Sequence, residues 1–343
     1  MPLKVVTFGE IMLRLSPPGF ERFFQSPLLS ATFGGGEANV AVSLAQLGLH
    51  SVYVTALPKH AIGDGAIRTL LGEGVDTSHI VRSGERVGIY FAETGASQRA
   101  STVIYDRAHS SISEIPADAI AWDRVMDGAA WFHVTGITPA LGEAGVAATK
   151  AAIAAAKKAS VRISVDLNYR KKLWTEAQAQ QTMRPLMRDV DVVIANEEDL
   201  QSVLGVHVEG VDVTSGALQI AGYRKAVERV TQQFGPSLVA ITLRESLSAS
   251  DNGWSALLWD AKSGTLHQSQ RYSVRLVDRI GGGDSFAAGL IFGLINGRPL
   301  DQALRFAVAA SALKQTIPGD FNRVSVAEVD ALVKGDASGR VQR

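Results

Sequence analysis

Residues 278–289 read DRIGGGDSFAAG, three glycines that lead through an aspartate into small and apolar residues. Glycines before a helix let a ligand approach the backbone, and the free N–H groups at the helix N-terminus form an anion site. Asp284 would repel a phosphate at that position unless it had a role of its own. A base that deprotonates an alcohol while the amides of Gly281, Gly282 and Gly283 hold a phosphate explains both features and predicts phosphoryl transfer. An ordinary turn with an acidic N-cap explains this window equally well, so the rest of the chain has to decide.

Composition limits the class of protein. The chain has 343 residues, 46% of them hydrophobic, enough for one large α/β domain or two ordinary domains. Lys plus Arg equals Asp plus Glu at 34 each, so charge gives no reason to expect a nucleic-acid or membrane partner. The absence of cysteine excludes disulfides and thiolate catalysis. The N-terminus has no signal-peptide pattern and no apolar run reaches transmembrane length, so we expect a cytoplasmic protein.

Strand-like and helix-like segments alternate along most of the chain. The expected strands are 5–10, 51–57, 131–134, 161–167, 190–195 and 238–243, and the expected helices are 63–73, 143–159, 175–187, 197–204, 223–234, 285–296, 300–315 and 326–333. This alternation predicts an α/β fold, a mainly parallel sheet with helices on both faces. Short strand-like runs between 255 and 274 predict an antiparallel edge.

Two segments, 11–33 and 87–113, fall outside this alternation and read as antiparallel strands. We place them in a small β lid over the site, because ligands in such folds bind at the carboxyl ends of the strands. No linker marks a domain boundary, so residues 1–333 are expected to form one kinase domain, followed by a polar tail at 334–343.

Polar residues gather where five segments should end at that edge of the sheet. The groups are Gly34, Gly35 and Gly36 with Asn39; residues 166–170; residues 196–199; residues 242–246; and the 278–289 motif. A kinase holds two substrates, and the first glycine group would let a small polyol approach the backbone, with Asn39 hydrogen-bonding to it. Asn196 and Asp199 lie one helical turn apart and could order Mg²⁺ through water; Asn196 could instead be a helix N-cap, or could serve both purposes. Neither GxxxxGK[ST] nor an N-terminal GxGxxG is present.

Taken together, these residues resemble the ribokinase-like (PfkB) carbohydrate kinases. GGGEANVA at 34–41 and DRIGGGDSFAAG match that family's two signatures, and the similarity covers almost the whole chain. The resemblance implies a ribokinase-like fold and an ATP-dependent kinase in which Asp284 is the base and the amides of 281–284 form an anion hole. It also implies that 196–199 takes part in ordering Mg²⁺, and that lid faces pair to give a homo-oligomer. Residues 242–246 fall on the nucleotide-binding T-x-G-x-x-G element, in which Arg244 replaces the first glycine.

Within that family the chain is most similar to 2-keto-3-deoxygluconate kinases, which make 2-keto-3-deoxy-6-phosphogluconate. The stretches that carry this similarity are YF at 90–91, GASQR at 95–99, IYDRA at 104–108, NYR at 168–170 and KQTIPGDF at 314–321. A sugar acid needs fixed cations, so Arg107 and Arg170 are expected to bind its carboxylate, while Arg170 could instead reach ATP.

The remaining expected contacts complete the two substrate sites. Tyr90 and Tyr105 would hydrogen-bond sugar hydroxyls, and the nucleotide would lie against Asn168, Asn196, Thr242 and Arg244. Two alternatives stay open: a kinase of a neutral ketose or nucleoside, and a non-catalytic sugar-binding protein.

Overall fold

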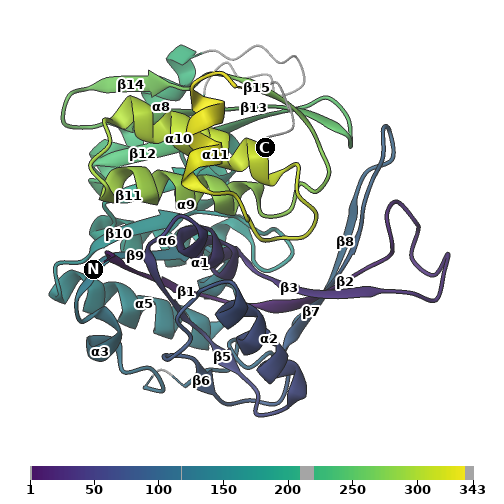
Figure 1. The fold of residues 1–343 in the computed structure, drawn as a ribbon. Helices are drawn as coiled ribbons and strands as arrows, with labels where there is room; N and C mark the ends of the chain where they lie inside the picture. Colours follow the sequence, from purple (N-terminus) through teal and green to yellow (C-terminus); the bar gives the residue numbers. More distant parts are fainter. Residues whose placement is uncertain (1, 117, 209–219, 337–343) are drawn as a thin grey trace.

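The computed structural model describes residues 2–116, 118–208 and 220–336. A nine-stranded sheet forms the centre of this part of the chain (Figure 1). In spatial order its strands are β14 (Thr265–Gln268), β13 (Asp251–Asp260), β12 (Leu238–Ser246), β11 (Val192–Ala195), β10 (Arg162–Asp166), β9 (Ala129–Thr135), β1 (Lys4–Phe8) and β4 (His50–Val54), with β15 (Tyr272–Arg275) paired to β13. The strands from β12 to β4 run parallel, and β13, β14 and β15 form an antiparallel edge. The predicted α/β class is therefore confirmed.

Helices cover both faces of this sheet. On one face lie α1 (Gly36–Gln46), α9 (Gly282–Ile295) and α10 (Leu300–Lys314), with α11 (Val326–Val333) against α10 and α2 (Ala61–Gly72) against α1. On the other lie α3 (Trp122–Met126), α5 (Glu143–Lys158), α6 (Glu176–Leu186) and α8 (Ile220–Phe234). Short helical segments at Ile137–Ala140 (α4), Met187–Asp189, Glu197–Asp199 (α7) and Leu200–Leu204 complete the set. The predicted helices are all present with shifted ends, whereas α3 and α4 were not foreseen.

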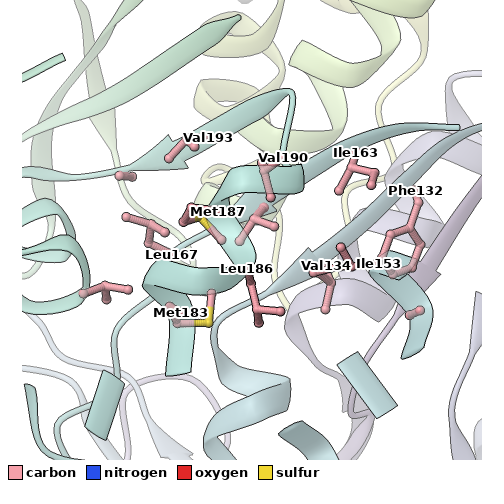
Figure 2. Close-up of a cluster of buried hydrophobic side chains, with 14 of the residues drawn as sticks. Phe132, Val134, Ile153, Ile163, Leu167, Met183, Leu186, Met187, Val190 and Val193 are labelled. Carbon is pink, nitrogen blue, oxygen red and sulfur yellow. The ribbon is translucent and has the colours of Figure 1, made fainter. Parts of the chain in front are cut away.

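Parallel strands read as continuous apolar runs because both of their faces are buried. In β11, Val193 packs into the cluster with α5 and α6, while its neighbours Val192 and Ile194 pack against α9 and α10. Figure 2 shows part of the first of these clusters, which includes Phe132 and Val193 of the sheet and Met183 of α6. The sheet is thus held rigid from both sides, so the loops at its carboxyl edge have fixed starting points.

A separate four-stranded sheet, here the second sheet, has the order β3 (Ser30–Gly34), β2 (Met12–Ser16), β7 (Gly88–Glu93) and β8 (Thr102–Asp106). Its strands come from the two segments that did not fit the alternation, and in Figure 1 it extends away from the body. The structure corrects one detail, because the central pair β2 and β7 runs parallel. A small third sheet pairs β5 (Ala56–Leu57) with β6 (Val81–Arg82).

Candidate active site

A cavity of about 850 Å³ opens between the carboxyl edge of the large sheet and the second sheet. The residues predicted from the sequence that line it are Gly35, Gly36, Asn39, Tyr90, Tyr105, Arg107, Asn168, Arg170, Asn196, Asp199, Thr242, Arg244, Gly281, Gly282, Gly283 and Asp284. Gly34 is not among the residues that line the cavity. A Cβ built on it would lie 2.1 Å from a carboxylate oxygen of Asp320. Glycine at position 34 therefore makes room for the side chain of Asp320, whereas all the other predicted residues line the same cavity.

Asp284 lies in the first turn of α9. Its Oδ2 accepts a 2.7 Å hydrogen bond from Nδ2 of Asn39. Burial raises the pKa of this carboxyl to about 6, although the Asn39 hydrogen bond acts in the opposite direction. A general base works best when its pKa is near the operating pH. Asp284 is therefore mostly ionised at neutral pH and more basic than an exposed aspartate.

The turn before α9 shows why glycines are needed there. Gly281 has φ of 83°, and a Cβ on it would lie 2.1 Å from the backbone oxygen of Asp320, so only glycine fits. A Cβ on Gly283 would meet no atom within 4 Å, so the surrounding protein does not require glycine there. Within the described chain the N–H groups of Gly283 and Asp284 have no acceptor, and no side chain caps the helix. These amides suit an anion brought close to the backbone.

Asn39 has a contact that sequence reasoning missed. Besides donating to Asp284, its Oδ1 accepts a hydrogen bond of 3.2 Å from the N–H of Gly35. The side chain thus links the first glycine group to the base. Its predicted contact with the sugar stays a prediction.

Asn196 and Asp199 form a reciprocal capping box. Oδ1 of Asn196 accepts from the N–H of Asp199 at 2.8 Å, and Oδ2 of Asp199 accepts from the N–H of Asn196 at 3.2 Å. Oδ1 of Asp199 also accepts from the N–H of Tyr169 at 2.8 Å. The N-cap alternative for Asn196 is therefore what the structure contains. Burial raises the pKa of Asp199 to about 6 despite these bonds.

Asp166, at the end of β10, belongs to the 166–170 group expected at this edge, but the sequence assigned it no role. It lines the cavity, and burial, followed by the charges of Asp199 and Asp284, raises its pKa well above the usual range. A buried carboxyl group whose pKa is raised by two neighbouring carboxylates marks a place that a cation would stabilise. Among the described residues no three acidic or histidine side chains are arranged as a ready-made metal cage. The donors thus fit a Mg²⁺ ion that keeps several of its waters, and not direct chelation.

The structure corrects the predicted backbone conformation of the nucleotide-binding segment, residues 242–246. Residues 242–246 were expected in a loop, but they continue β12 and pair with β13 as far as Ser246 opposite Asn252. The hydroxyl of Thr242 donates to the backbone oxygen of Ala195 at 3.4 Å, which is a weak contact. The chain continues as a strand because the two glycines that would open a loop are Arg244 and Leu247 here.

Arg279 is a second residue that sequence reasoning missed. It lines the cavity, and its Nε is buried with no hydrogen-bond partner among the described residues. Burial, and then the nearby charge of Arg244, lowers the pKa of Arg279. Two guanidinium groups on one wall are stabilised by an anion between them. The replacement of a variable signature position by arginine at 279 was the available signal.

The aromatic and cationic side chains of the second sheet form ion pairs and hydrogen bonds within the protein that were not predicted. Arg107 is buried and forms an ion pair with Glu10, and its Nε donates to Oε2 of Glu10 at 2.7 Å. The hydroxyl of Tyr90 donates to Asp320 at 2.6 Å. Tyr105 is 39% exposed, with its ring 6.0 Å from that of Tyr90.

Arg170 is less constrained than Arg107. Among the described residues its guanidinium donates one hydrogen bond, to the backbone oxygen of Tyr169 at 3.1 Å, and forms no ion pair. Of the two arginines expected to bind a substrate carboxylate, Arg170 has the more available guanidinium.

A base beside an anion-binding turn, at the carboxyl edge of a doubly covered parallel sheet, defines an enzyme that transfers a phosphoryl group to an alcohol. The chain belongs to the pfkB family of carbohydrate kinases, whose model matches residues 3–323. The predicted family and fold are thus confirmed.

Several relatives cover the chain almost completely. It is 34% identical over 339 residues, 99% of both chains, to a 2-dehydro-3-deoxygalactonokinase of Haloferax volcanii. It is 28% identical to a 2-dehydro-3-deoxygluconokinase of Bacillus subtilis, covering 96% of this chain and 94% of that one. A crystal structure of a 2-dehydro-3-deoxygluconokinase from Thermotoga maritima superimposes with a TM-score of 0.93 at 50% identity, covering 97% of this chain and all of the other. No helix among residues 2–116, 118–208 and 220–336 combines the length and apolarity needed to cross a bilayer.

Proposed function

We propose that the protein phosphorylates the C6 hydroxyl of 2-keto-3-deoxygluconate with ATP. The observation that carries the proposal is Asp284, held by Asn39 next to the unpaired amides of the glycine turn. Support for a sugar acid comes from the available guanidinium of Arg170 and from the substrates named for the relatives. The relative from Haloferax volcanii is named for the galactonate-derived acid, so the C4 epimer is the nearest competing substrate.

In the proposed reaction Asp284 accepts the proton of the C6 hydroxyl. The oxygen then forms a bond to the γ-phosphorus of ATP while the bond from that phosphorus to the β,γ-bridging oxygen breaks, and ADP leaves. The N–H groups of Gly283 and Asp284 donate to the transferred phosphoryl oxygens, on which charge is concentrated. Donors fixed before the reaction lower its barrier because they need no reorganisation.

The nucleotide is proposed to lie along the wall formed by the end of β12 and the loop before α9. Arg244 and Arg279 would bind the polyphosphate, which would also supply the missing partner of Nε of Arg279. Asn168, Asn196 and Thr242 line the same side of the cavity.

Mg²⁺ would be held near Asp166 and Asp199, mostly through water, and would offset the negative charge of the phosphates. The raised pKa values of these carboxyl groups support this placement.

On the sugar side, we propose that the second sheet acts as a lid. Tyr90, Tyr105 and Arg107 come from its strands or the segment directly after them, and all three line the cavity. Closing this sheet over a bound sugar would exclude water, which would otherwise accept the phosphoryl group. Because Glu10 neutralises Arg107, the main carboxylate contact is assigned to Arg170.

An ADP-release assay tests the proposal with purified protein, ATP and Mg²⁺. The acceptors are 2-keto-3-deoxygluconate, 2-keto-3-deoxygalactonate, fructose, ribose and a ribonucleoside. We expect kcat/KM for the keto-deoxy acids to exceed that for the neutral acceptors by about 100-fold or more, since a site that pairs a charge discriminates strongly against substrates lacking it. Equal turnover of fructose would support the neutral-ketose alternative, and the absence of turnover with every acceptor would support a non-catalytic role.

A further inference from the structure

Lys314, the last residue of α10, has a side chain that is completely buried (0% exposed). Its ammonium group donates to the backbone oxygen of Asp278 at 3.2 Å, to that of Gly319 at 2.6 Å, and to that of Ile280. Among the described residues it forms no ion pair. An ammonium group is costly to bury unless its donors are satisfied, and here three main-chain carbonyls satisfy all three.

These carbonyls belong to the two loops that build the phosphate-binding turn. Asp278 and Ile280 lie just before Gly281, and Gly319 lies next to Asp320, whose backbone oxygen packs against Gly281. The side chain of Asp278 reinforces the link by accepting from the N–H of Ile280 at 3.0 Å and from the N–H of Gly319 at 3.1 Å. The ammonium of Lys314 therefore lies where the two loops join.

Lys314 belongs to a cluster of charged side chains whose positive and negative charges are equal in number. Arg14, from β2 of the second sheet, forms 2.7 Å ion pairs with both Asp278 and Asp320. With Lys314 the cluster has two positive and two negative groups, all of them buried. Without Lys314 it would carry a net negative charge, directly beneath the turn that has to accept a phosphate. The turn would lose both its geometry and part of its attraction for the anion.

We propose that Lys314 is a positioning residue whose ammonium group acts as a built-in monovalent cation, gathering the carbonyls of Asp278, Ile280 and Gly319 so that the amides of Gly283 and Asp284 point at the transferred phosphate. This inference rests on the proposal that the turn binds that phosphate. A ring of backbone carbonyls is also the coordination that a free monovalent cation prefers. Since Lys314 fills the ring, the wild-type enzyme needs no such ion, whereas removal of the side chain creates a place for one.

The test compares wild-type protein with Lys314→Ala, and with Lys150→Met as a control at an exposed lysine on α5. Turnover is measured in buffers in which the only added monovalent cation is tetramethylammonium, sodium, potassium or ammonium. We expect wild type and Lys150→Met to turn over at the same rate in all four. Lys314→Ala should lose about 100-fold in kcat in tetramethylammonium, the scale of losing one oxyanion donor, with a much smaller change in the KM for sugar.

Potassium or ammonium should restore Lys314→Ala by about tenfold or more, because each fits among three carbonyl oxygens, whereas tetramethylammonium cannot donate or coordinate there. A purely structural role for Lys314 would not give this cation-selective recovery. Thermal unfolding verifies that the variant is folded, and Lys314→Met, which keeps the apolar stem, replaces it if it is not.

Three results would overturn the inference: normal kcat in Lys314→Ala, a loss of kcat that no cation repairs, or a wild-type enzyme that depends on potassium. The wild-type measurement requires no variant to fold. Failure of wild type to phosphorylate any sugar acid refutes the proposed function instead, so the two outcomes are distinguishable.

Discussion

Replacing Asn39 by leucine should move the acid limb of the pH–rate profile. The 2.7 Å hydrogen bond from Asn39 favours the ionised form of Asp284 and so lowers its pKa, which burial has raised to about 6. A hydrogen bond to a charged group contributes about 1.5–3 kcal/mol, and 1.36 kcal/mol corresponds to one pKa unit, so its loss raises the pKa of Asp284 by about 1–2 units. Leucine has the same side-chain branching and number of heavy atoms as asparagine, and its larger methyl groups leave little room for a replacement water.

The direction in which the acid limb moves follows from the proposed role of Asp284 as the base. In the proposed mechanism ionised Asp284 is the active form, so kcat/KM should fall as pH drops through its pKa. In wild type the limb should be centred near 6, the pKa of Asp284. In Asn39→Leu it should move to about 7–8, so that activity at pH 7 falls several-fold while activity at pH 9 is largely retained, apart from any lost sugar contact.

The assay is kcat/KM for the sugar acid from pH 5 to 9.5, with ADP release as the readout. Gln46→Ala, at the far end of the same helix, serves as the matched control and should keep the wild-type profile. An unshifted limb together with wild-type activity at high pH in a folded Asn39→Leu protein would refute the assignment of Asp284 as the titrating base. A uniform loss of activity at all pH values would show that Asn39 acts on the substrate and not on the base.

Four further predictions concern the chemistry, the substrates and the assembly. Asp284→Asn should lower kcat by about 10²–10⁴-fold, with the ATP dissociation constant nearly unchanged by calorimetry; wild-type-like turnover contradicts the mechanism. Arg170→Met should raise the KM for the sugar acid by about tenfold or more and leave that for fructose unaltered, and an equal change for both would move Arg170 to the ATP site. Gly283→Ala should fold with wild-type thermal stability, because its Cβ meets no atom within 4 Å, yet lose ATP turnover; retained activity argues against a phosphate there. The second sheet exposes Ile104, and the β2–β3 connection exposes Phe24, which is 85% exposed, so light scattering should find a homodimer, and a monomer at micromolar concentration would refute this.

Local sequence patterns were sufficient to predict the fold. The strands of the large sheet are buried on both faces and therefore appear as unbroken apolar runs, and helices such as α5 and α8 present a periodic apolar side. The segments that form the second sheet were recognisable because they interrupt that alternation. The parallel pairing of β2 with β7 was not, because strand partners far apart in sequence leave no local signal.

The candidate site was likewise predictable from the sequence only in part. Glycines that need a positive φ or a close ligand, as at Gly281 and Gly283, are visible as letters in the sequence, and so is a carboxylate next to them. The partners of the polar side chains were not visible. Glu10 forms an ion pair with Arg107, and Asp320 accepts a hydrogen bond from Tyr90. Nε of Arg279 has no hydrogen-bond partner among the described residues.

The sequence by itself therefore determined the class of fold, through its periodicity. Through motifs that resemble those of a known family it also indicated the carbohydrate kinase family and most of the residues gathered at the cavity. Only the tertiary structure decided what each charged group does, since a charge acts through its neighbours within a few ångströms. Lys314 illustrates this difference. In the sequence it is one lysine at the end of a helix, and only the folding of two distant loops around its ammonium gives it three carbonyl partners beneath the glycine turn before α9.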